Sequence, residues 1–304
     1  MNSIDALIAS IDAVSLTNSQ DRYPHHTNKA ESGLPLLHIH NRYCEAVIAP
    51  QGAHVLEFTP TDSSPLLWLS PKAKFAKGQA IRGGIPVCLP WFGVNQRDPD
   101  KPKHGFVRNR DWQLTQVSST DTGATQLVFA FSYSDIEPKL FAYPFQVTLT
   151  ITLSHNLELT LSVTNTGTET MPFSWALHSY HPVANLATTQ VEGLDGKRYL
   201  DNTRGLQPAI QSGAVVFDGE VDRAYEQVDA TQILNGNPRI TVTGENCDSA
   251  IVWNPGGELA STIGDIGRDA YDQFVCVERG AAFGDEWELG AGESRVGRLT
   301  VAVG

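Results

Sequence analysis

The sequence predicts an all-β fold: a large antiparallel β-sandwich spans residues 30–304 and follows a short, partly helical extension at residues 1–29. Three observations support this prediction. Several segments alternate apolar and polar residues, which is the period of a strand with one buried face. The chain contains 26 Gly and 17 Pro, and turn signals rich in these residues separate the alternating segments. No strand–helix–strand alternation occurs, which argues against parallel α/β architectures.

A single domain is predicted from residue 30 onwards. The 304 residues would allow two domains of ~150 residues each, but all-β domains often exceed that length. No change of composition and no Ser/Gly-rich linker divides the chain. In the extension, Ile4, Leu7, Ile8 and Ile11 recur at helical spacing, which predicts a short amphipathic helix. No basic residues precede this apolar stretch, so it is not expected to be an export signal.

The clearest strands lie between residues 145 and 163. Residues 145–153 alternate apolar with polar side chains, and residues 157–163 do so again. The intervening Ser-His-Asn at 154–156 predicts a hairpin turn. The other segments predicted as strands are 36–48, 54–58, 125–133, 240–243, 250–253, 274–277 and 295–303.

Charge and composition exclude some classes of function. The 34 acidic residues exceed the 22 basic ones and give a net charge of −12, so no nucleic-acid partner is expected, because phosphate backbones attract basic surfaces. No apolar run reaches the ~20 residues of a membrane span. The four cysteines contain no CxxC pair. We predict reduced thiols in a cytoplasmic protein, although pairing among them stays open.

Arg82 is a first candidate for a site residue. It is the one charged residue among the glycines, prolines and aromatic residues of 80–93. A guanidinium in such surroundings needs an anionic or hydroxyl-rich partner. Two interpretations stay open: a contact to a ligand, or a structural arginine that fastens a loop to backbone carbonyls.

A second candidate is the basic segment 97–110, which holds five basic residues and two acidic ones within an acidic chain. A small anion such as phosphate would be attracted to it. The alternative is a solvated surface loop. His104 is followed by Gly105 and Phe106, which favours the edge of a cleft over a solvated loop.

His178 and Glu278 are candidates for acid/base chemistry. His178 ends an apolar run, and such a histidine is often a hydrogen-bonded structural residue. Glu278 ends the apolar segment from Phe274, and a period of two places Phe274, Cys276 and Glu278 on one face of the strand. A carboxylate on a buried sheet face is costly unless it is solvated or used. Because an imidazole titrates near neutrality, this pair could transfer protons.

No metal site is predicted. His38 and His40 would lie on one strand face, and His25 adjoins His26, but neither pair has an evident third ligand. The chain also lacks a nucleophile elbow, a P-loop and a dinucleotide-binding fingerprint.

Five short motifs occur in an order that resembles one family, the hexose-6-phosphate mutarotases (glucose-6-phosphate 1-epimerases) of the galactose mutarotase-like superfamily. The similarity runs from about residue 30 to the C-terminus, and the motifs together are far more specific than any one alone. They are Arg-Gly-Gly-Ile-Pro at 82–86 with Pro-Trp-Phe-Gly at 90–93, His-Gly-Phe-Val-Arg at 104–108, Leu-His-Ser-Tyr at 177–180, Asp-Arg-Ala-Tyr at 222–225 and Val-Cys-Val-Glu at 275–278.

The resemblance implies a β-supersandwich isomerase without cofactor or metal that interconverts the α and β anomers of a hexose 6-phosphate, with glucose 6-phosphate as the expected substrate. By motif, His178 resembles the general acid and Glu278 the general base. Three further residues resemble contacts to sugar hydroxyls and the ring oxygen, and one resembles a phosphate contact. These are Arg82, His104 and Asp222 for the sugar and Arg108 for the phosphate.

One departure from the family concerns His181, where phenylalanine is frequent, and this puts substrate preference in doubt. We expect a cytoplasmic monomer with a small-molecule substrate and with neither nucleic acid nor membrane as a partner. Two other functions stay open: an aldose 1-epimerase acting on free hexoses, and a non-catalytic carbohydrate-binding sandwich that would use Trp91, Phe92 and Tyr180 as stacking surfaces.

Overall fold

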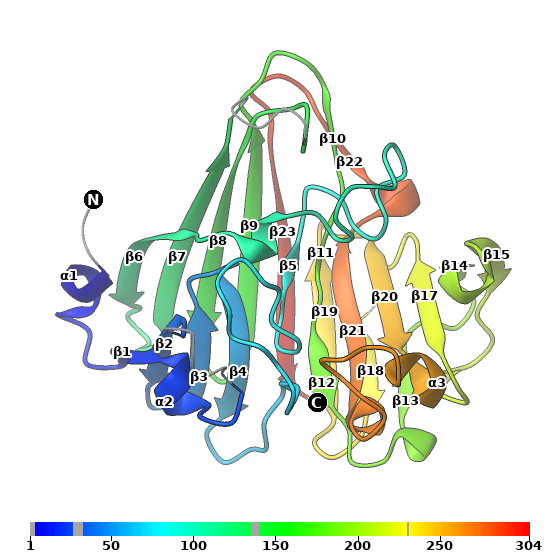
Figure 1. Cartoon of the computed structure of the whole chain (residues 1–304), viewed down its shortest axis with the longest axis horizontal. Helices are drawn as coiled ribbons and strands as arrows, with labels where there is room; N and C mark the ends of the chain where they lie inside the picture. Colours follow the sequence, from blue (N-terminus) through cyan, green and yellow to red (C-terminus); the bar gives the residue numbers. More distant parts are fainter. Residues whose placement is uncertain (1–3, 27–32, 135–139, 230) are drawn as a thin grey trace.

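The structure, a computed structural model, describes residues 4–26, 33–134, 140–229 and 231–304. Its strands form two large sheets of nine and eight strands, a four-stranded sheet and a two-stranded ribbon (Figure 1). The all-β prediction is confirmed. Within the described residues, no helix has the length and apolar character needed to cross a membrane.

The nine-stranded sheet contains the hairpin predicted at 145–163. Apolar residues of both strands are buried at every second position, and Phe145 lies opposite Asn165 in antiparallel register. In spatial order the strands are β16 (Val215–Val216), β13 (Gln190–Glu192), β18 (Gln232–Asn235), β19 (Ile240–Glu245), β23 (Ser294–Val303), β9 (Leu157–Asn165), β8 (Phe145–Leu153), β7 (Thr125–Tyr133) and β6 (Gln113–Ser119).

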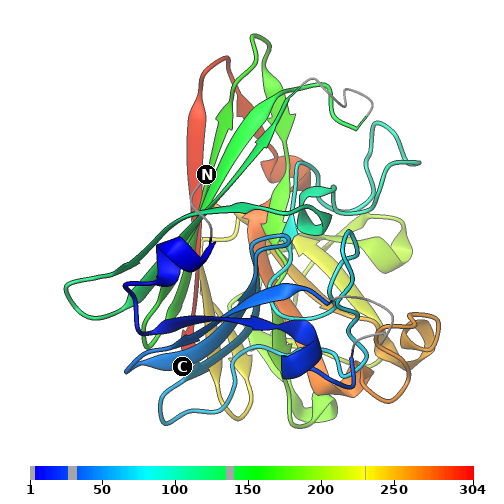
Figure 2. The ribbon, with the colours of Figure 1, turned by 60° about the vertical axis from the view of Figure 1, so that its left-hand side comes forward.

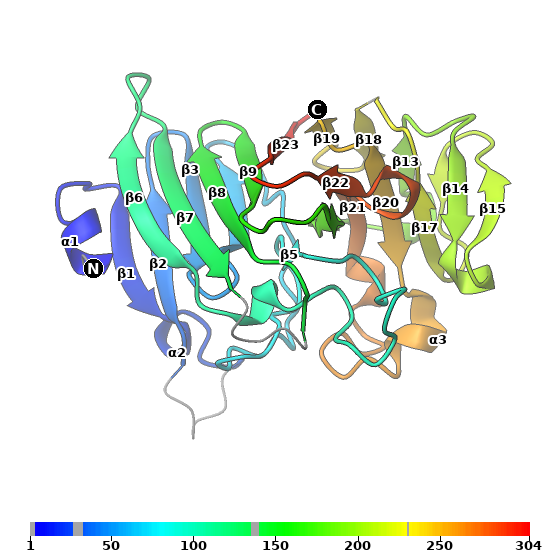
Figure 3. The same ribbon diagram turned by 90° about the horizontal axis from the view of Figure 1, so that it is seen from above.

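The eight-stranded sheet carries the residues predicted for the site. Its strands are β15 (Gln207–Ile210), β14 (Arg198–Asp201), β17 (Val221–Tyr225), β20 (Ser249–Asn254), β21 (Phe274–Ala281), β11 (Trp175–Leu177) and β5 (Val87–Cys88), with β12 (Tyr180–Pro182) also paired to β21. Seen from above, β6–β9 lie at one end of the molecule and β14, β15 and β17 at the other (Figure 3). A separate two-stranded ribbon consists of β10 (Met171–Phe173) and β22 (Trp287–Leu289).

The four-stranded sheet corrects one sequence prediction. Residues 36–48 were expected to form one strand, but they form a hairpin, because the side chain of Asn41 accepts hydrogen bonds from the N–H groups of Tyr43 (2.8 Å) and Cys44 (3.0 Å) and turns the chain. The sheet consists of β1 (Val14–Asn18), β2 (Pro35–His40), β3 (Cys44–Ala49) and β4 (His54–Pro60).

The extension takes part in this sheet, since β1 pairs with β2. The predicted helix exists as α1 (Ile4–Ile8), which ends before Ile11 and packs near β6, beside the N-terminal strands that Figure 2 brings forward. The boundary expected between residues 29 and 30 lies outside the described residues. The other helical elements are α2 (Ser19–Arg22), α3 (Gly256–Ala260) and the 3₁₀ turns η1 (Val107–Asn109), η2 (Leu186–Thr188), η3 (Asn202–Arg204), η4 (Tyr271–Gln273) and η5 (Phe283–Asp285).

Alternate residues of strand β21 point to opposite faces of the sheet, one towards the main core and one towards the site. Val275 and Val277 belong to the large apolar core between the sheets. Arg279 continues this inner face, where its guanidinium donates to the side chain of Gln232 (2.7 Å) and to the carbonyl oxygens of Val228 (2.6 Å) and Cys247 (2.7 Å). The alternate residues from Phe274 to Glu278 therefore point to the opposite face.

Candidate active site

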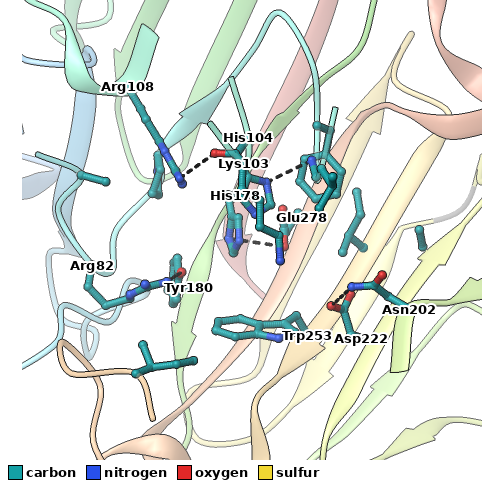
Figure 4. Close-up of a pocket in the computed structure, with 18 of the residues that line it drawn as sticks. Arg82, Lys103, His104, Arg108, His178, Tyr180, Asn202, Asp222, Trp253 and Glu278 are labelled. Atoms are coloured by element: carbon teal, nitrogen blue, oxygen red, sulfur yellow. Dashed lines mark hydrogen bonds and ion pairs between the residues drawn. The ribbon is translucent and has the colours of Figure 1, made fainter. Parts of the chain in front are cut away.

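A pocket of about 370 Å³ opens on that opposite face of β21. Six of its lining residues are those that the sequence analysis singled out: Arg82, His104, Arg108, His178, Asp222 and Glu278. Figure 4 shows them converging from loops and strands that lie far apart in the chain. The volume is within the ~300–1,000 Å³ range of small-molecule sites.

His178 and Glu278 meet at the centre of the pocket. Glu278 comes from β21, and His178 lies between β11 and β12, where its N–H donates to the carbonyl oxygen of Pro86 (3.0 Å). Nδ1 of His178 lies 3.3 Å from Oε1 of Glu278 (Figure 4). Neither that nitrogen nor either carboxylate oxygen has an aligned hydrogen-bond partner among the described residues, so all three atoms can bind a ligand.

Burial drives both members of this pair towards their uncharged forms. Burial raises the pKa of Glu278 well above its ordinary value, and the negative charge of Asp222 acts in the same direction. Burial also lowers the pKa of His178 well below its ordinary value, with Arg108 and Arg82 adding repulsion. The pair therefore holds a single proton between its two apparent pKa values, and that proton titrates as a property of both residues.

A stack of side chains fixes the orientation of His178. Its imidazole lies against the ring of Tyr180, with centroids 4.8 Å apart and planes 9° from parallel. The Tyr180 hydroxyl accepts a hydrogen bond from Arg82 (2.9 Å), and Arg82 also donates to Asp265 (3.1 Å). Arg82 thus lines the pocket, and its partners are side chains rather than the backbone carbonyls expected of a loop-fastening arginine. Its contact to a ligand stays a prediction.

His104 is held as a neutral hydrogen-bond donor. Its backbone adopts φ +66°, and its Nδ1 accepts from the N–H of Gly93 (3.3 Å), so the proton of the neutral ring is on Nε2. Burial lowers the pKa of His104 well below its ordinary value. Gly105 follows at φ +70°, and a Cβ there would lie 1.9 Å from the carbonyl oxygen of Leu89, which explains the His-Gly sequence.

The basic segment 97–110 divides into two groups. Arg97 pairs with Glu286 (3.4 Å) and Lys101 with Asp98 (3.8 Å), away from the pocket lining. The side chains of Lys103 and Arg108 line the pocket. Arg108 also donates to the backbone oxygen of Lys103 (3.1 Å). The segment is therefore partly a solvated loop and partly a cationic pocket wall.

Asp222 lies on the opposite side of the pocket from the two arginines (Figure 4). It accepts a 2.6 Å hydrogen bond from the side-chain amide of Asn202, while burial raises the pKa of its carboxyl group. The pocket thus has cationic groups at one end and a polar carboxylate–amide pair at the other.

Sequence reasoning missed several lining residues. Asn202 and Asp265 reach the pocket from η3 and from the segment after α3, and no local pattern marked them. Trp253 could have been found, because the two-residue period of 250–253 places it on the same face as Ile251, and both line the pocket. Lys103 was noted only as part of the basic segment.

His181 lies outside the pocket lining. Its Nδ1 donates to the carbonyl oxygen of Leu66 (2.9 Å), and burial lowers its pKa to about 4. Among the histidine pairs weighed as metal ligands, His38 instead makes a 2.9 Å contact with Glu45. A three-donor group does exist among the described residues: His178, Cys276 and Glu278 each place one ligand-type atom within 4.8 Å of the others.

Comparisons with known proteins identify relatives of this chain. The profile of the aldose 1-epimerase family matches residues 35–302. An Escherichia coli K12 protein named "Putative glucose-6-phosphate 1-epimerase" is 34% identical over 250 residues, 81% of this chain and 82% of that protein. A Cenchrus ciliaris protein of the same name is 33% identical over 287 residues, 90% and 86% of the two chains.

The fold is shared with a solved structure. The crystal structure of a "putative mutarotase (YeaD)" from Salmonella typhimurium superposes with a TM-score of 0.81 at 29% identity, covering 88% of this chain and 90% of that chain. The family match spans more than half of the sequence, and the two relatives exceed 30% identity over most of their length. This chain is therefore a member of the aldose 1-epimerase family.

Proposed function

We propose that the protein is a hexose-6-phosphate 1-epimerase that interconverts the α and β anomers of glucose 6-phosphate. The observation that carries the proposal is the 3.3 Å contact between His178 and Glu278 in a pocket whose wall also holds Arg108 and Lys103. A buried pair that shares one proton suits ring opening, which removes one proton from the sugar and adds another. The names of the relatives support the same substrate.

Ring opening needs two proton transfers. The carboxylate of Glu278 takes the proton of the C1 hydroxyl, the electron pair forms the C1 carbonyl, and the bond from C1 to the ring oxygen breaks. The imidazolium of His178 gives its proton to the departing ring oxygen. Rotation about C1–C2 presents the other face of the aldehyde, and the same transfers run backwards on closure. Each positioned proton transfer is worth roughly 10²–10⁴-fold in rate.

The two proton distributions of the pair are the reactant and product states of this step. The proton resides on His178 before ring opening and on Glu278 afterwards. Burial favours the second distribution, while the charges of Lys103 and Arg108 lower the pKa of Glu278 and favour its carboxylate. These cations therefore assist the general base in addition to attracting the phosphoryl group.

The remaining residues position the sugar. Nε2–H of His104 donates to a sugar oxygen beside His178, since the two imidazole centroids are 5.5 Å apart. Asp222 accepts from a hydroxyl at the far end of the pocket, and Arg82 holds Tyr180 against His178 while contributing a positive charge. Holding reactants in a productive geometry supplies a large part of such catalysis.

The substrate is tested by comparing anomer exchange of glucose and glucose 6-phosphate by NMR at equal enzyme concentration. We expect a higher kcat/KM for the phosphorylated sugar, because Arg108 and Lys103 bind its dianion. Equal values would contradict the phosphate assignment and favour an aldose 1-epimerase acting on free hexoses. Binding of sugar without any catalysed exchange would favour the carbohydrate-binding module.

We also propose a cytoplasmic monomer. All four cysteines are buried and free, which suits a reducing compartment. The exposed large apolar side chains of the described residues are spread over β1, β15, β16, β23 and the loop at Val94, with Val296 and Val303 near opposite ends of β23. Singly scattered apolar residues of this kind are normal on a monomer surface. Light scattering coupled to gel filtration tests the monomer: a mass near 33.1 kDa is expected, and twice that mass would contradict it.

A further inference from the structure

Cys276 lies directly beside the His178–Glu278 pair. It precedes Glu278 by two residues on β21, so both side chains project from the same face of the strand. One donor atom from each of His178, Cys276 and Glu278 lies within 4.8 Å of the other two, and all three residues are buried. Cys276 is not among the residues that line the pocket, and it packs in a buried cluster with Tyr180 and Phe274.

A second observation points to a ligand at this position. Nδ1 of His178 and both carboxylate oxygens of Glu278 are inaccessible to solvent and have no hydrogen-bond partner within the described chain. Buried polar atoms are normally satisfied. The substrate satisfies them during catalysis, and a cation would satisfy the same lone pairs between turnovers.

We propose that His178, Cys276 and Glu278 bind a divalent cation such as Zn²⁺, and that its binding inhibits the epimerase activity. Imidazole nitrogen, thiolate sulfur and carboxylate oxygen are the ligands that Zn²⁺ takes in proteins, and three of them leave a fourth position for water or a sugar hydroxyl. The thiol proton and the single proton of the His178–Glu278 pair both leave to solvent as the bonds to the metal form, and no oxidation state changes.

The geometry suits a metal after a small contraction. With Zn–N and Zn–O bonds of ~2.1 Å and a Zn–S bond of ~2.3 Å, tetrahedral donors lie roughly 3.3–3.7 Å apart. The 3.3 Å between Nδ1 of His178 and Oε1 of Glu278 already meets this, and the longest separation, at most 4.8 Å, must shorten by ~1 Å. Once bound, the cation occupies the lone pairs that ring opening needs, so the metal-bound enzyme cannot transfer protons.

The inhibitory effect rests on the proposed function, whereas the metal site itself does not. Two measurements on the full chain therefore keep them apart. In the first, Co²⁺ replaces Zn²⁺ as a spectroscopic probe, and a thiolate-to-cobalt charge-transfer band reports a metal–sulfur bond without any assay of activity. In the second, anomer exchange of glucose 6-phosphate is followed while Zn²⁺ is added and then removed with a chelator.

Cys276→Ser and Cys276→Ala are the diagnostic variants, and Cys44→Ala, which alters another buried free cysteine on β3, is the matched control. We expect the cobalt band in the wild type and in the control but in neither Cys276 variant. We expect Zn²⁺ to inhibit the wild type reversibly, and ~10-fold or more Zn²⁺ to be needed for the Cys276 variants, whose metal-free activity stays at the wild-type level.

Three results would overturn the proposal. They are the absence of a cobalt–thiolate band in the wild type, the same band in both Cys276 variants, and equal zinc sensitivity of all four proteins. A different result would separate the two proposals. If the cobalt band depends on Cys276 but neither the wild type nor any variant catalyses anomer exchange, the metal site is supported and the proposed function is wrong.

Discussion

The Nδ1 atom of His178 and the Oε1 atom of Glu278 lie 3.3 Å apart, although the two residues are 100 positions apart in the sequence. The contact exists because β21 pairs with both β11 and β12, on either side of His178. Both side chains are almost fully buried, at 8% and 1% exposure. In such surroundings a shared proton interacts strongly with its two bases and weakly with solvent.

Glu278→Gln should remove catalysis while leaving binding largely intact. The amide keeps the size of the side chain but cannot take a proton from the C1 hydroxyl, so a loss of ~10²–10⁴-fold in kcat is expected. NMR exchange spectroscopy measures the rate, and calorimetric titration with glucose 6-phosphate measures binding. Glu286→Gln, which alters the surface partner of Arg97, is the control. Unchanged turnover in Glu278→Gln would assign the base to another residue.

The rate should depend on pH as a bell-shaped curve. The pair works while it holds one proton. Below the pKa of His178, which burial lowers, both residues are protonated and no base remains; above the pKa of Glu278, which burial raises, both are deprotonated and no acid remains. A plot of kcat/KM against pH, extended in both directions until each limb is reached, tests this. A profile with no limb on either side over the pH range in which the protein stays folded would contradict the pair.

Arg108→Met should discriminate between phosphorylated and free sugar. A charge-assisted contact to phosphate is worth ~1.5–3 kcal/mol, so KM for glucose 6-phosphate should rise by ~10–100-fold, with little change for glucose. Arg97→Met is the matched control, since Arg97 belongs to the same basic segment but pairs with Glu286 outside the pocket lining. Equal rises in KM for both sugars would show that Arg108 stabilises the loop rather than binding the phosphate group.

His181→Phe should change stability rather than catalysis. Burial lowers the pKa of the His181 imidazole to about 4, whereas in the unfolded chain its pKa is near the ordinary histidine value of about 6.5. Between these values the unfolded state binds more protons, so the free energy of unfolding falls as pH decreases from 6.5 to 4. The contribution reaches roughly 3 kcal/mol at the acid end.

His181→Phe removes this pH-dependent contribution to the free energy of unfolding. Urea denaturation of the variant should therefore show a smaller loss of stability as the pH falls towards 4. The exposed His155→Phe is the control and should leave the slope unchanged. Anomer exchange at pH 7 should be unaffected by His181→Phe, because His181 does not line the pocket. A slope identical to that of the wild type would contradict the role of this histidine.

Local patterns predicted those parts of the site that depend on one strand. The two-residue period predicted that Phe274, Cys276 and Glu278 share one strand face, and in the structure Val275 and Val277 pack in the main core while Glu278 lines the pocket. The same kind of pattern failed at 36–48, because the polar residues His-Asn-Arg at 40–42 mark a turn made by the side chain of Asn41 rather than the continuation of one strand. Period alone carries no information on where a strand reverses.

Residues that reach the pocket through long-range pairing could not be predicted. Asn202 meets Asp222 because β14 pairs with β17, and Asp265 meets Arg82 across 183 positions. No spacing in the sequence encodes either contact. The family resemblance supplied Asp222 and Arg108 through motifs, whereas Asn202 and Asp265 depended on the structure.

The alternation along β21 makes neighbouring residues serve opposite sides of one sheet, with Glu278 in the pocket and Arg279 among the core contacts to Gln232 and Val228. A slip of one position would exchange these two charges, burying the carboxylate where the guanidinium belongs and presenting the guanidinium to the sugar. Inserting or deleting a single codon in this strand would therefore damage folding and chemistry together, so evolution can vary the loops around the pocket far more freely than the length of this strand.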